Sequence, residues 1–297
     1  MESLGIGVVG FGWMGRVHAQ AYARVRHHYP QALRTEMVAV ADDVPGRADA
    51  AAAQFGFARA VGDWHELVDD PAVQAVSITA PNFLHREMGA AFAAAGKHIW
   101  IEKPVGLSAA DARAIVGDVQ VAVGFNYRNA PAVEKARALL QTGEIGRVTH
   151  ARFKFQSDYA AAEDGTLTWR YSRERGGHGV LGDLGSHGVD LIRYLLGEID
   201  AVVADTAVFL PNRPKPTGAT AGHGRSSSDE TGPVENEDYL AALLRMGDGA
   251  RVVLDASRVA GGEQNAYGFE IHGTRGALFW DFRRMGELGI GSGPSWP

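Results

Sequence analysis

The 297-residue sequence contains no cysteine, no block of like charges and no long apolar run. Without cysteine there are no disulfides and no thiolate metal ligands, a composition that suits a reducing compartment. The net charge of −6, with no cluster of Lys and Arg, argues against a nucleic-acid or anionic-membrane partner. No apolar stretch reaches the ~18 residues of a membrane span, and the start lacks the pattern of a signal peptide. We therefore expect a cytoplasmic globular protein.

The first half of the chain alternates short apolar, β-branched segments with helix-like segments. This alternation with short connections predicts a doubly wound parallel sheet of the Rossmann type. The second half has longer stretches that alternate apolar and polar residues, which predicts a mostly antiparallel, open-sheet α+β domain with one wet face. The boundary therefore falls between a dinucleotide-binding domain, 1–123, and a second domain, 124–297, for substrate binding and oligomerisation. Residues 211–236 are rich in Pro, Gly, Ser and Thr and are predicted to form a long loop.

A glycine-rich motif, Gly10-Phe11-Gly12-Trp13-Met14-Gly15, joins the first predicted strand to a helical pattern. Glycine serves the tight turn, the approach of the backbone to a pyrophosphate, and close helix–strand packing. The helix N-terminus adds free N–H groups and partial positive charge for the phosphates. The motif therefore predicts dinucleotide binding, with a purely structural glycine turn as the alternative.

Asp42 follows the second predicted strand, where an acid commonly binds the adenosine ribose. It lies farther from Gly15 than the typical ~20 residues, and the segment 29–34 can absorb the excess. A carboxylate at this position would repel a 2′-phosphate, which favours NAD over NADP. Arg47 is close enough in sequence to keep NADP open, and the neighbouring Asp43 is interpreted as a solvated loop acid.

Lys103 directly follows a buried apolar segment, 99–101, and precedes Pro104. Proline cannot continue a central strand, so the amine belongs at the carboxyl end of a parallel strand, the edge that binds ligands. An ammonium group there can polarise a substrate oxygen or stabilise an alkoxide. A surface Glu–Lys pair is the alternative. Asn82 and His85 follow another predicted strand toward the same edge.

Asp183 and His187 lie four residues apart at the start of a pattern with helical spacing that Gly197 can end. A carboxylate beside an imidazole can orient it and raise its proton affinity, which would make a proton carrier near neutral pH. The same spacing also suits metal ligands, although no further ligand candidate accompanies the pair. A helix cap together with a core histidine is a third interpretation.

Taken together, the chain resembles the Gfo/Idh/MocA family of NAD(P)-dependent sugar and cyclitol oxidoreductases. The resemblance spans about residues 6–288 and depends on the order and spacing of several short motifs. The motifs are the glycine turn, Thr79-Ala80-Pro81-Asn82 with His85, Glu102-Lys103-Pro104, Gly124-Phe125-Asn126-Tyr127-Arg128 and Gly182-Asp183-Leu184-Gly185-Ser186-His187.

The resemblance implies a hydride-transfer reaction in which Lys103 binds the reacting hydroxyl, His187 takes its proton, and Asp183 positions the substrate or the imidazole. Implied cofactor contacts, to NAD or to NADP as the alternative, are Gly10, Phe11, Gly12, Trp13, Met14, Gly15, Asp42, Thr79, Pro81, Asn82, His85, Glu102, Lys103 and Arg128. Implied substrate contacts are Lys103, Asn126, Arg128, Trp169, Arg170, Asp183 and His187. No metal is implied, and the expected partners are a polyol or sugar substrate and further copies of the chain.

Two features depart from the family pattern: a short segment between Val116 and Gly124, and an end at 292–297 where the family usually continues. The first hypothesis is an inositol- or sugar-type dehydrogenase. The second is a member that uses bound NAD transiently, for glycoside cleavage or epimerisation. The third is a catalytically silent, dinucleotide-binding regulator, which the presence of both Lys103 and His187 disfavours.

Overall fold

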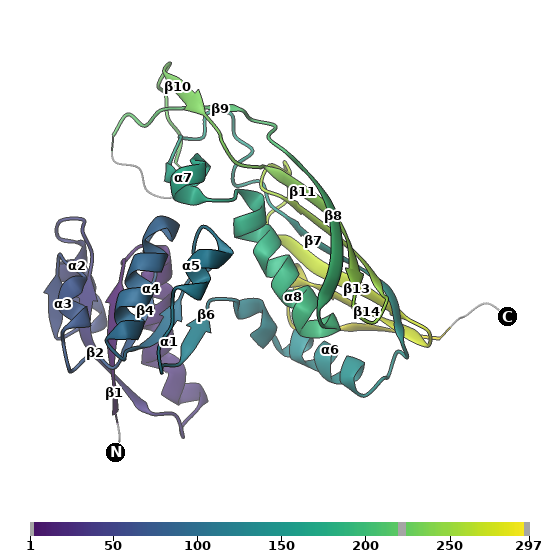
Figure 1. The fold of residues 1–297 in the computed structure, drawn as a ribbon, viewed down its shortest axis with the longest axis horizontal. Helices are drawn as coiled ribbons and strands as arrows, with labels where there is room; N and C mark the ends of the chain where they lie inside the picture. The colour runs from purple at the N-terminus through teal and green to yellow at the C-terminus, as the bar shows by residue number, and fades with distance from the viewer. Residues whose placement is uncertain (1–2, 219–223, 294–297) are drawn as a thin grey trace. The chain divides into compact units, whose positions relative to one another are not determined.

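The computed structural model describes residues 3–218 and 224–293. The chain forms two compact units, Met1–Gly124 and Phe125–Pro297 (Figure 1). The sequence-based boundary falls one residue earlier.

Unit 1 is built on a six-stranded sheet with the order β3-β2-β1-β4-β5-β6, in which every pairing is parallel. Apolar clusters cover both faces of this sheet, so the predicted doubly wound arrangement is confirmed. The strands are β1 (Ser3–Val9), β2 (Arg34–Ala41), β3 (Arg59–Val61), β4 (Ala75–Ile78), β5 (His98–Ile101) and β6 (Val121–Val123). The helices are α1 (Trp13–His28), α2 (Arg47–Phe55), α3 (His65–Val68), the 3₁₀ turn η1 (Asn82–Leu84), α4 (His85–Ala94) and α5 (Ala109–Arg113).

Unit 2 contains a seven-stranded sheet with the order β15-β14-β13-β7-β12-β11-β8. All pairings are antiparallel except that between β7 and β12, so the sheet is mixed but mostly antiparallel, as predicted. Its strands are β7 (Val148–Gln156), β8 (Ile199–Ala207), β11 (Tyr239–Met246), β12 (Arg251–Ser257), β13 (Ala266–Gly273), β14 (Gly276–Asp281) and β15 (Gly289–Ser292).

Helices cover one face of the unit 2 sheet and leave the other face open. Alternate residues of β7, β11, β12 and β13 join Leu191 and Ile192 of helix α8 in one apolar core, and α8 runs along the sheet in Figure 1. The predicted wet face is therefore confirmed. The remaining elements are η2 (Asn126–Asn129), α6 (Pro131–Gln141), η3 (Trp169–Tyr171), α7 (Arg173–Gly176), the π-helical turn η4 (Leu181–Gly185), α8 (Ser186–Leu196) and η5 (Phe282–Arg284).

The expectation of one long loop over 211–236 is wrong at both ends of that segment. Strands β9 (Asn212–Pro214) and β10 (Thr231–Pro233) pair in an antiparallel hairpin. Arg213 on β9 is fully buried, and its Nη1 donates to the carbonyl oxygen of Ala162 at 3.0 Å. Arg213 thus connects one end of the segment to a part of the chain remote in sequence, a contact that composition does not reveal. Residues 219–223 of this segment, including His223, lie outside the described residues.

Candidate functional site

The glycine turn between β1 and α1 has the geometry that a dinucleotide requires. Gly10 has φ of +82°, and a Cβ there would lie 2.8 Å from the backbone of Ala80, so only glycine fits. A Cβ on Gly15 would lie 2.5 Å from the carbonyl oxygen of Gly10, which explains the close packing of α1 on the turn. At Gly12 a Cβ would meet no described atom within 4 Å.

The N-terminus of α1 fits a pyrophosphate. Among the described residues no side chain caps this end, because the N-cap is Gly12, and the first turn carries no acid. The first N–H groups of the 16-residue helix are therefore available for an anion, in front of the open space at Gly12. The residues present thus fit the predicted cofactor at this point.

Asp42, predicted to bind the ribose, also holds the glycine turn. Its carboxylate accepts the N–H of Phe11 at 2.6 Å and the N–H of Val44 at 2.9 Å. Arg47 contributes an ion pair at 3.3 Å. The side chain of Asp42 is only 2% exposed, whereas the adjacent Asp43 is exposed.

The three residues of the glycine turn that are not glycine differ in exposure. The side chain of Phe11 packs edge-on against Phe55 and Phe57 in the core, so a cofactor could meet only its backbone. Trp13 is 78% exposed and Met14 is half-buried.

Strands β4 and β5 bring further predicted residues to the same edge of the sheet as the glycine turn. The hydroxyl of Thr79, just after β4, donates to the carbonyl oxygens of Val9 and Gly10. Pro81 and Asn82 begin η1 immediately afterwards. Lys103 follows the neighbouring strand β5, whose carboxyl end lies at the same edge because all strands are parallel.

His85 and Glu102, which were predicted as cofactor contacts, are both buried in the protein. His85 is 0% exposed, and its two ring nitrogens lie 2.8 Å from the carbonyl oxygens of Pro104 and Ala80. Glu102 is buried, and its carboxylate contacts the ring of His18 at 3.0 Å. His18, which sequence reasoning did not single out, therefore lies directly beneath the Glu102-Lys103-Pro104 segment.

In unit 2, Asp183 belongs to the π-helical turn η4 and His187 to the first turn of α8. Such π turns often occur at functional positions. The carboxylate of Asp183 accepts a hydrogen bond from the hydroxyl of Tyr159 at 2.6 Å. Burial raises the pKa of Tyr159 well above its usual value, and the charge of Asp183 adds to this effect, so the phenol remains a donor. Sequence reasoning missed Tyr159, since a tyrosine 24 residues away carries no local signal.

The imidazole of His187 lies among aromatic rings. Tyr127 meets it edge-on with ring centres 4.9 Å apart, Phe125 does so at 5.6 Å, and Phe155 is tilted at 6.0 Å. Burial raises the pKa of Tyr127 to about 12, with a further contribution from Asp183. The phenols of this cluster therefore stay protonated at neutral pH.

Asn126 and Arg128 lie on η2, next to these aromatic residues in sequence. The Arg128 guanidinium forms a fork-like pair with Asp190 of α8, with its Nε 2.7 Å from one carboxylate oxygen. This pair raises the pKa of Arg128 further, so the group stays charged. The guanidinium is thus committed to holding η2 on α8, which sequence reasoning did not anticipate.

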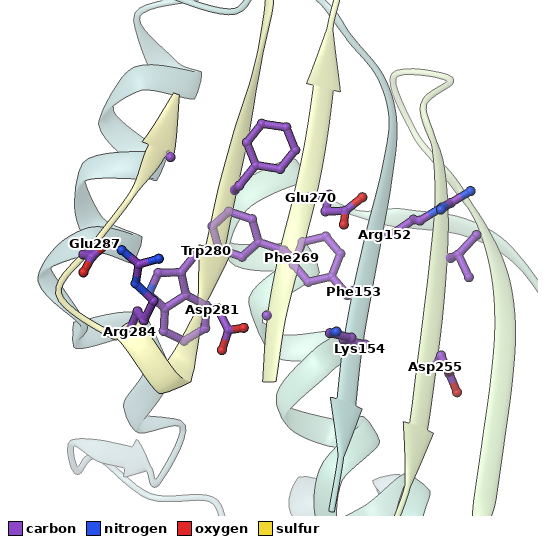
Figure 2. Close-up of a pocket in the computed structure, with 14 residues that line it drawn as sticks. Arg152, Phe153, Lys154, Asp255, Phe269, Glu270, Trp280, Asp281, Arg284 and Glu287 are labelled. Carbon is purple, nitrogen blue, oxygen red and sulfur yellow. Dashed lines mark hydrogen bonds and ion pairs between the residues drawn. The ribbon is translucent and has the colours of Figure 1, made fainter. Parts of the chain in front are cut away.

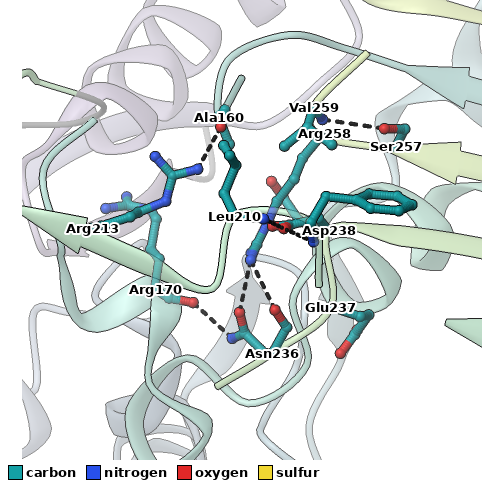
Figure 3. A network of polar contacts seen from close by, with 12 residues as sticks. Ala160, Arg170, Leu210, Arg213, Asn236, Glu237, Asp238, Ser257, Arg258 and Val259 are labelled. Atoms are coloured by element: carbon teal, nitrogen blue, oxygen red, sulfur yellow. Dashed lines mark hydrogen bonds and ion pairs between the residues drawn. The ribbon is translucent and has the colours of Figure 1, made fainter. Parts of the chain in front are cut away.

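Trp169 and Arg170 lie on η3, where the Arg170 guanidinium covers the Trp169 ring at 4.5 Å. A buried polar network is hydrogen-bonded to the backbone of this turn (Figure 3). The Asn236 side chain donates to the carbonyl oxygen of Arg170 at 2.8 Å and accepts from Arg258 at 3.0 Å, and Arg258 pairs with Asp238 at 2.8 Å. The predicted site residues on η3 are therefore positioned by groups more than 60 residues away.

A hollow of about 550 Å³ lies on the open face of the unit 2 sheet (Figure 2). Charged side chains of both signs line it, among them Arg152, Lys154, Asp255 and Glu270. None of the predicted site residues lines this hollow, so its size does not make it the candidate active site.

Within residues 3–218 and 224–293, no three His, Cys, Asp or Glu side chains gather as a metal-binding group. No helix in the same ranges has both the length and the apolar character needed to cross a membrane.

Comparisons with known proteins agree with this geometry. Residues 4–121 match the family described as "Oxidoreductase family, NAD-binding Rossmann fold", and residues 133–279 match the "GFO/IDH/MocA C-terminal domain". Levoglucosan dehydrogenase of Pseudarthrobacter phenanthrenivorans is 36% identical over 98% of this chain and 76% of that protein. Myo-inositol 2-dehydrogenase of Thermotoga maritima is 29% identical over 93% of this chain and 75% of that protein.

A solved structure of levoglucosan dehydrogenase in complex with NADH and levoglucosan superimposes with a TM-score of 0.92. It is 34% identical, and the match covers 99% of this chain and 78% of that one. With a parallel-sheet unit that carries the glycine turn and a mixed-sheet unit that carries Asp183 and His187, the chain belongs to the Gfo/Idh/MocA family of oxidoreductases with an NAD-binding Rossmann fold.

Proposed function

We propose that the chain oxidises a hydroxyl group of a sugar or cyclitol with NAD, and catalyses the reverse reduction. The observation that carries this proposal is the amine-bearing Lys103 at the same sheet edge as the glycine turn. The relatives named as levoglucosan and inositol dehydrogenases support the substrate class, and levoglucosan is the first compound to test.

Bound NAD would supply the acceptor for the hydride that leaves the substrate carbon. Lys103 binds the hydroxyl oxygen and stabilises the alkoxide as it forms. His187 takes the hydroxyl proton, a step that typically contributes ~10²–10⁴-fold to the rate. Asp183, held by the Tyr159 hydroxyl, positions the substrate or the imidazole.

The remaining predicted residues form the walls of the two ligand sites. Trp169, Arg170 and Asn126 contact the substrate, and Arg128 supports them through its pair with Asp190. On the cofactor side, the backbone of the glycine turn holds the pyrophosphate, and Thr79, Pro81 and Asn82 face the nicotinamide half.

NAD is favoured over NADP. The carboxylate of Asp42 repels a 2′-phosphate, and Arg47, which could have bound that phosphate, is paired with Asp42. We also infer a cytoplasmic location, which the cysteine-free composition supports.

A panel of levoglucosan, inositols and sugars with NAD or NADP, followed by absorbance of the reduced cofactor, tests the proposal. Lys103→Ala and His187→Ala should each lower kcat ~10²–10⁴-fold while NADH binding changes little. The exposed counterparts Lys135→Ala and His27→Ala should behave as wild type. Cofactor that stays bound without net NADH formation would favour the redox-neutral alternative, and unchanged activity in both site variants would remove the pair from the mechanism.

The open face of the unit 2 sheet supports self-association. Leu243, Val253 and Phe279 expose apolar side chains there, 63%, 37% and 38% exposed. Exposed apolar patches of this kind mark interaction surfaces. The second copy of the chain is the partner that the charge pattern of the face fits.

Two rows of mainly charged side chains run across the strands of this face, on either side of a central row. The central row consists of Phe279, Glu270, Arg152, Val253 and Leu243, so it holds one acid and one base among its apolar residues. One row is basic and consists of His272, His150, Arg251 and Arg245. The other is mainly acidic and consists of Asp281, Lys154, Asp255 and Asp205. A twofold axis across the strands would lay the basic row of one copy on the acidic row of the other, with the two central rows in contact.

A further inference from the structure

Two buried histidines of unit 1, His18 on α1 and His85 on α4, have no part in the chemistry proposed above. They are 1% and 0% exposed, so neither is a free surface group. We propose that both are positioning residues that hold Lys103 from either side, His18 through the Glu102 carboxylate and His85 through the Pro104 carbonyl. This inference rests on the role of Lys103 in the proposed function.

On one side, His18 fixes the carboxylate of Glu102. Its Nε2 lies 3.0 Å from Oε1 of Glu102, and the other carboxylate oxygen accepts the backbone N–H of Lys103 at 3.3 Å. The carboxylate also packs tightly on Gly124, where a Cβ would lie 2.6 Å from Oε1. Gly124 therefore bounds the Glu102 carboxylate on one side, and the carboxylate contacts the peptide of Lys103 on another.

His18 is itself held on its opposite edge. Its Nδ1 lies 3.0 Å from the hydroxyl oxygen of Ser77, which lies 2.8 Å from the hydroxyl of Tyr22. In the neutral ring, Nε2–H donates to Glu102 and Nδ1 accepts from Ser77, whose oxygen in turn accepts from Tyr22. The ring also stacks on Trp100, with centres 3.7 Å apart. An unbroken series of hydrogen bonds thus orients the imidazole toward the carboxylate.

On the other side, His85 connects Lys103 with the cofactor turn. Its Nδ1 lies 2.8 Å from the carbonyl oxygen of Pro104, and its Nε2 lies 2.8 Å from that of Ala80. Ala80 follows Thr79, the residue whose hydroxyl bonds to the glycine turn. The imidazole therefore lies between the carbonyl oxygen of the residue after Lys103 and the one at the end of β4. The neutral ring donates to one of these oxygens, which is that of Pro104 in the Nδ1–H tautomer, and the protonated ring donates to both.

The consequence is that the backbone on both sides of Lys103 is fixed relative to the glycine turn. A misplacement of about 1 Å at a reacting group can cost ~10²-fold in rate. Loss of either histidine should therefore lower kcat ~10–10²-fold, with a much smaller rise in the KM of the polyol.

The primary test compares His18→Phe with His27→Phe in the full chain. The first variant keeps a ring on Trp100 but removes both hydrogen bonds, and the second changes an exposed histidine of the same helix. His18→Phe should lower kcat ~10–10²-fold while His27→Phe equals wild type. Equal kcat in the two folded variants overturns the proposal. If His18→Phe does not fold, Ser77→Ala removes only the Nδ1 partner and should lower kcat by a smaller factor; an unchanged kcat in that variant also overturns it.

A double-mutant cycle tests whether His18 acts through Glu102. Glu102→Gln alone and the double variant should have similar kcat values, because the histidine then has no carboxylate to hold. Multiplying effects would show that His18 acts independently and would refute this arm. His85→Phe gives the second arm, and its effect should multiply with that of His18→Phe.

Two readouts on the cofactor-free chain separate this inference from the proposed function. Nitrogen-15 NMR should find His18 as the Nε2–H tautomer, and mass spectrometry should find that acylation of Lys103 by acetic anhydride is altered in His18→Phe and unchanged in His27→Phe. If wild type forms no NADH with any polyol, the proposed function fails, and these two readouts decide the positioning by themselves. In that case, unaltered acylation of Lys103 in His18→Phe together with the Nδ1–H tautomer of His18 overturns the positioning role.

Discussion

Asp42 is the residue at which turn geometry and cofactor binding can be tested by one substitution. Its carboxylate accepts the N–H groups of Phe11 and Val44 and pairs with Arg47. Asp42→Ala removes all three interactions, whereas the exposed neighbour in Asp43→Ala gives a matched control. Asp42→Asn keeps the shape and one acceptor oxygen, so it should have about half the effect.

The bond to Phe11 dominates the expected magnitude. It is 2.6 Å long, buried and formed to a charged acceptor, a type that contributes roughly 1.5–3 kcal/mol. The Arg47 side chain is 42% exposed, so screening leaves its ion pair worth little. A loss of about 2 kcal/mol from the bound turn corresponds to a rise of roughly 30-fold in the Kd of NADH.

Fluorescence titration with NADH and NADPH and thermal melting of the cofactor-free chain form the assay. Asp42→Ala should melt below Asp43→Ala even without cofactor, because the turn loses its acceptor. The variant should lose less affinity for NADPH than for NADH, since the repulsion of the 2′-phosphate is gone. Melting and NADH affinity equal to those of Asp43→Ala would refute the role of Asp42 in the turn.

Three further predictions concern stability and assembly. Arg258→Met should destabilise unit 2 by about 3 kcal/mol in denaturant titration, because it leaves Asp238 buried without its ion-pair partner; an unchanged midpoint would contradict this. Burial lowers the pKa of His85, so the unfolded chain binds this proton first and stability falls as the pH drops through ~6.5. His85→Phe should reduce the dependence of folding stability on pH in this range. An unchanged pH dependence would show that His85 does not contribute to it. Leu243→Glu should convert oligomers to single chains in sedimentation, while an unaltered mass would place the interface elsewhere.

Much of unit 1 could be predicted from the sequence because its signals are local. The strand before Gly10, the turn itself and the helix after it follow one another without interruption. Likewise, Ser108 is a residue type that favours the N-cap of a helix, and at the start of α5 its side chain accepts the N–H of Asp111. In unit 2 the alternation of apolar and polar residues was sufficient to predict strands and an open face, but not the parallel pairing of β7 with β12.

The hydrogen bonds that hold the predicted site residues could not be predicted from the sequence, because each one joins segments remote in sequence. Nothing in the local pattern connects His18 with Glu102, Tyr159 with Asp183, or Asn236 with Arg170. Residue types and their spacing were enough to propose groups for the chemistry, since glycine, lysine and histidine carry the required capacity in themselves. Tertiary packing alone decided which of these groups are held by buried partners, because a hydrogen bond depends on where two atoms meet in space and not on their separation along the chain.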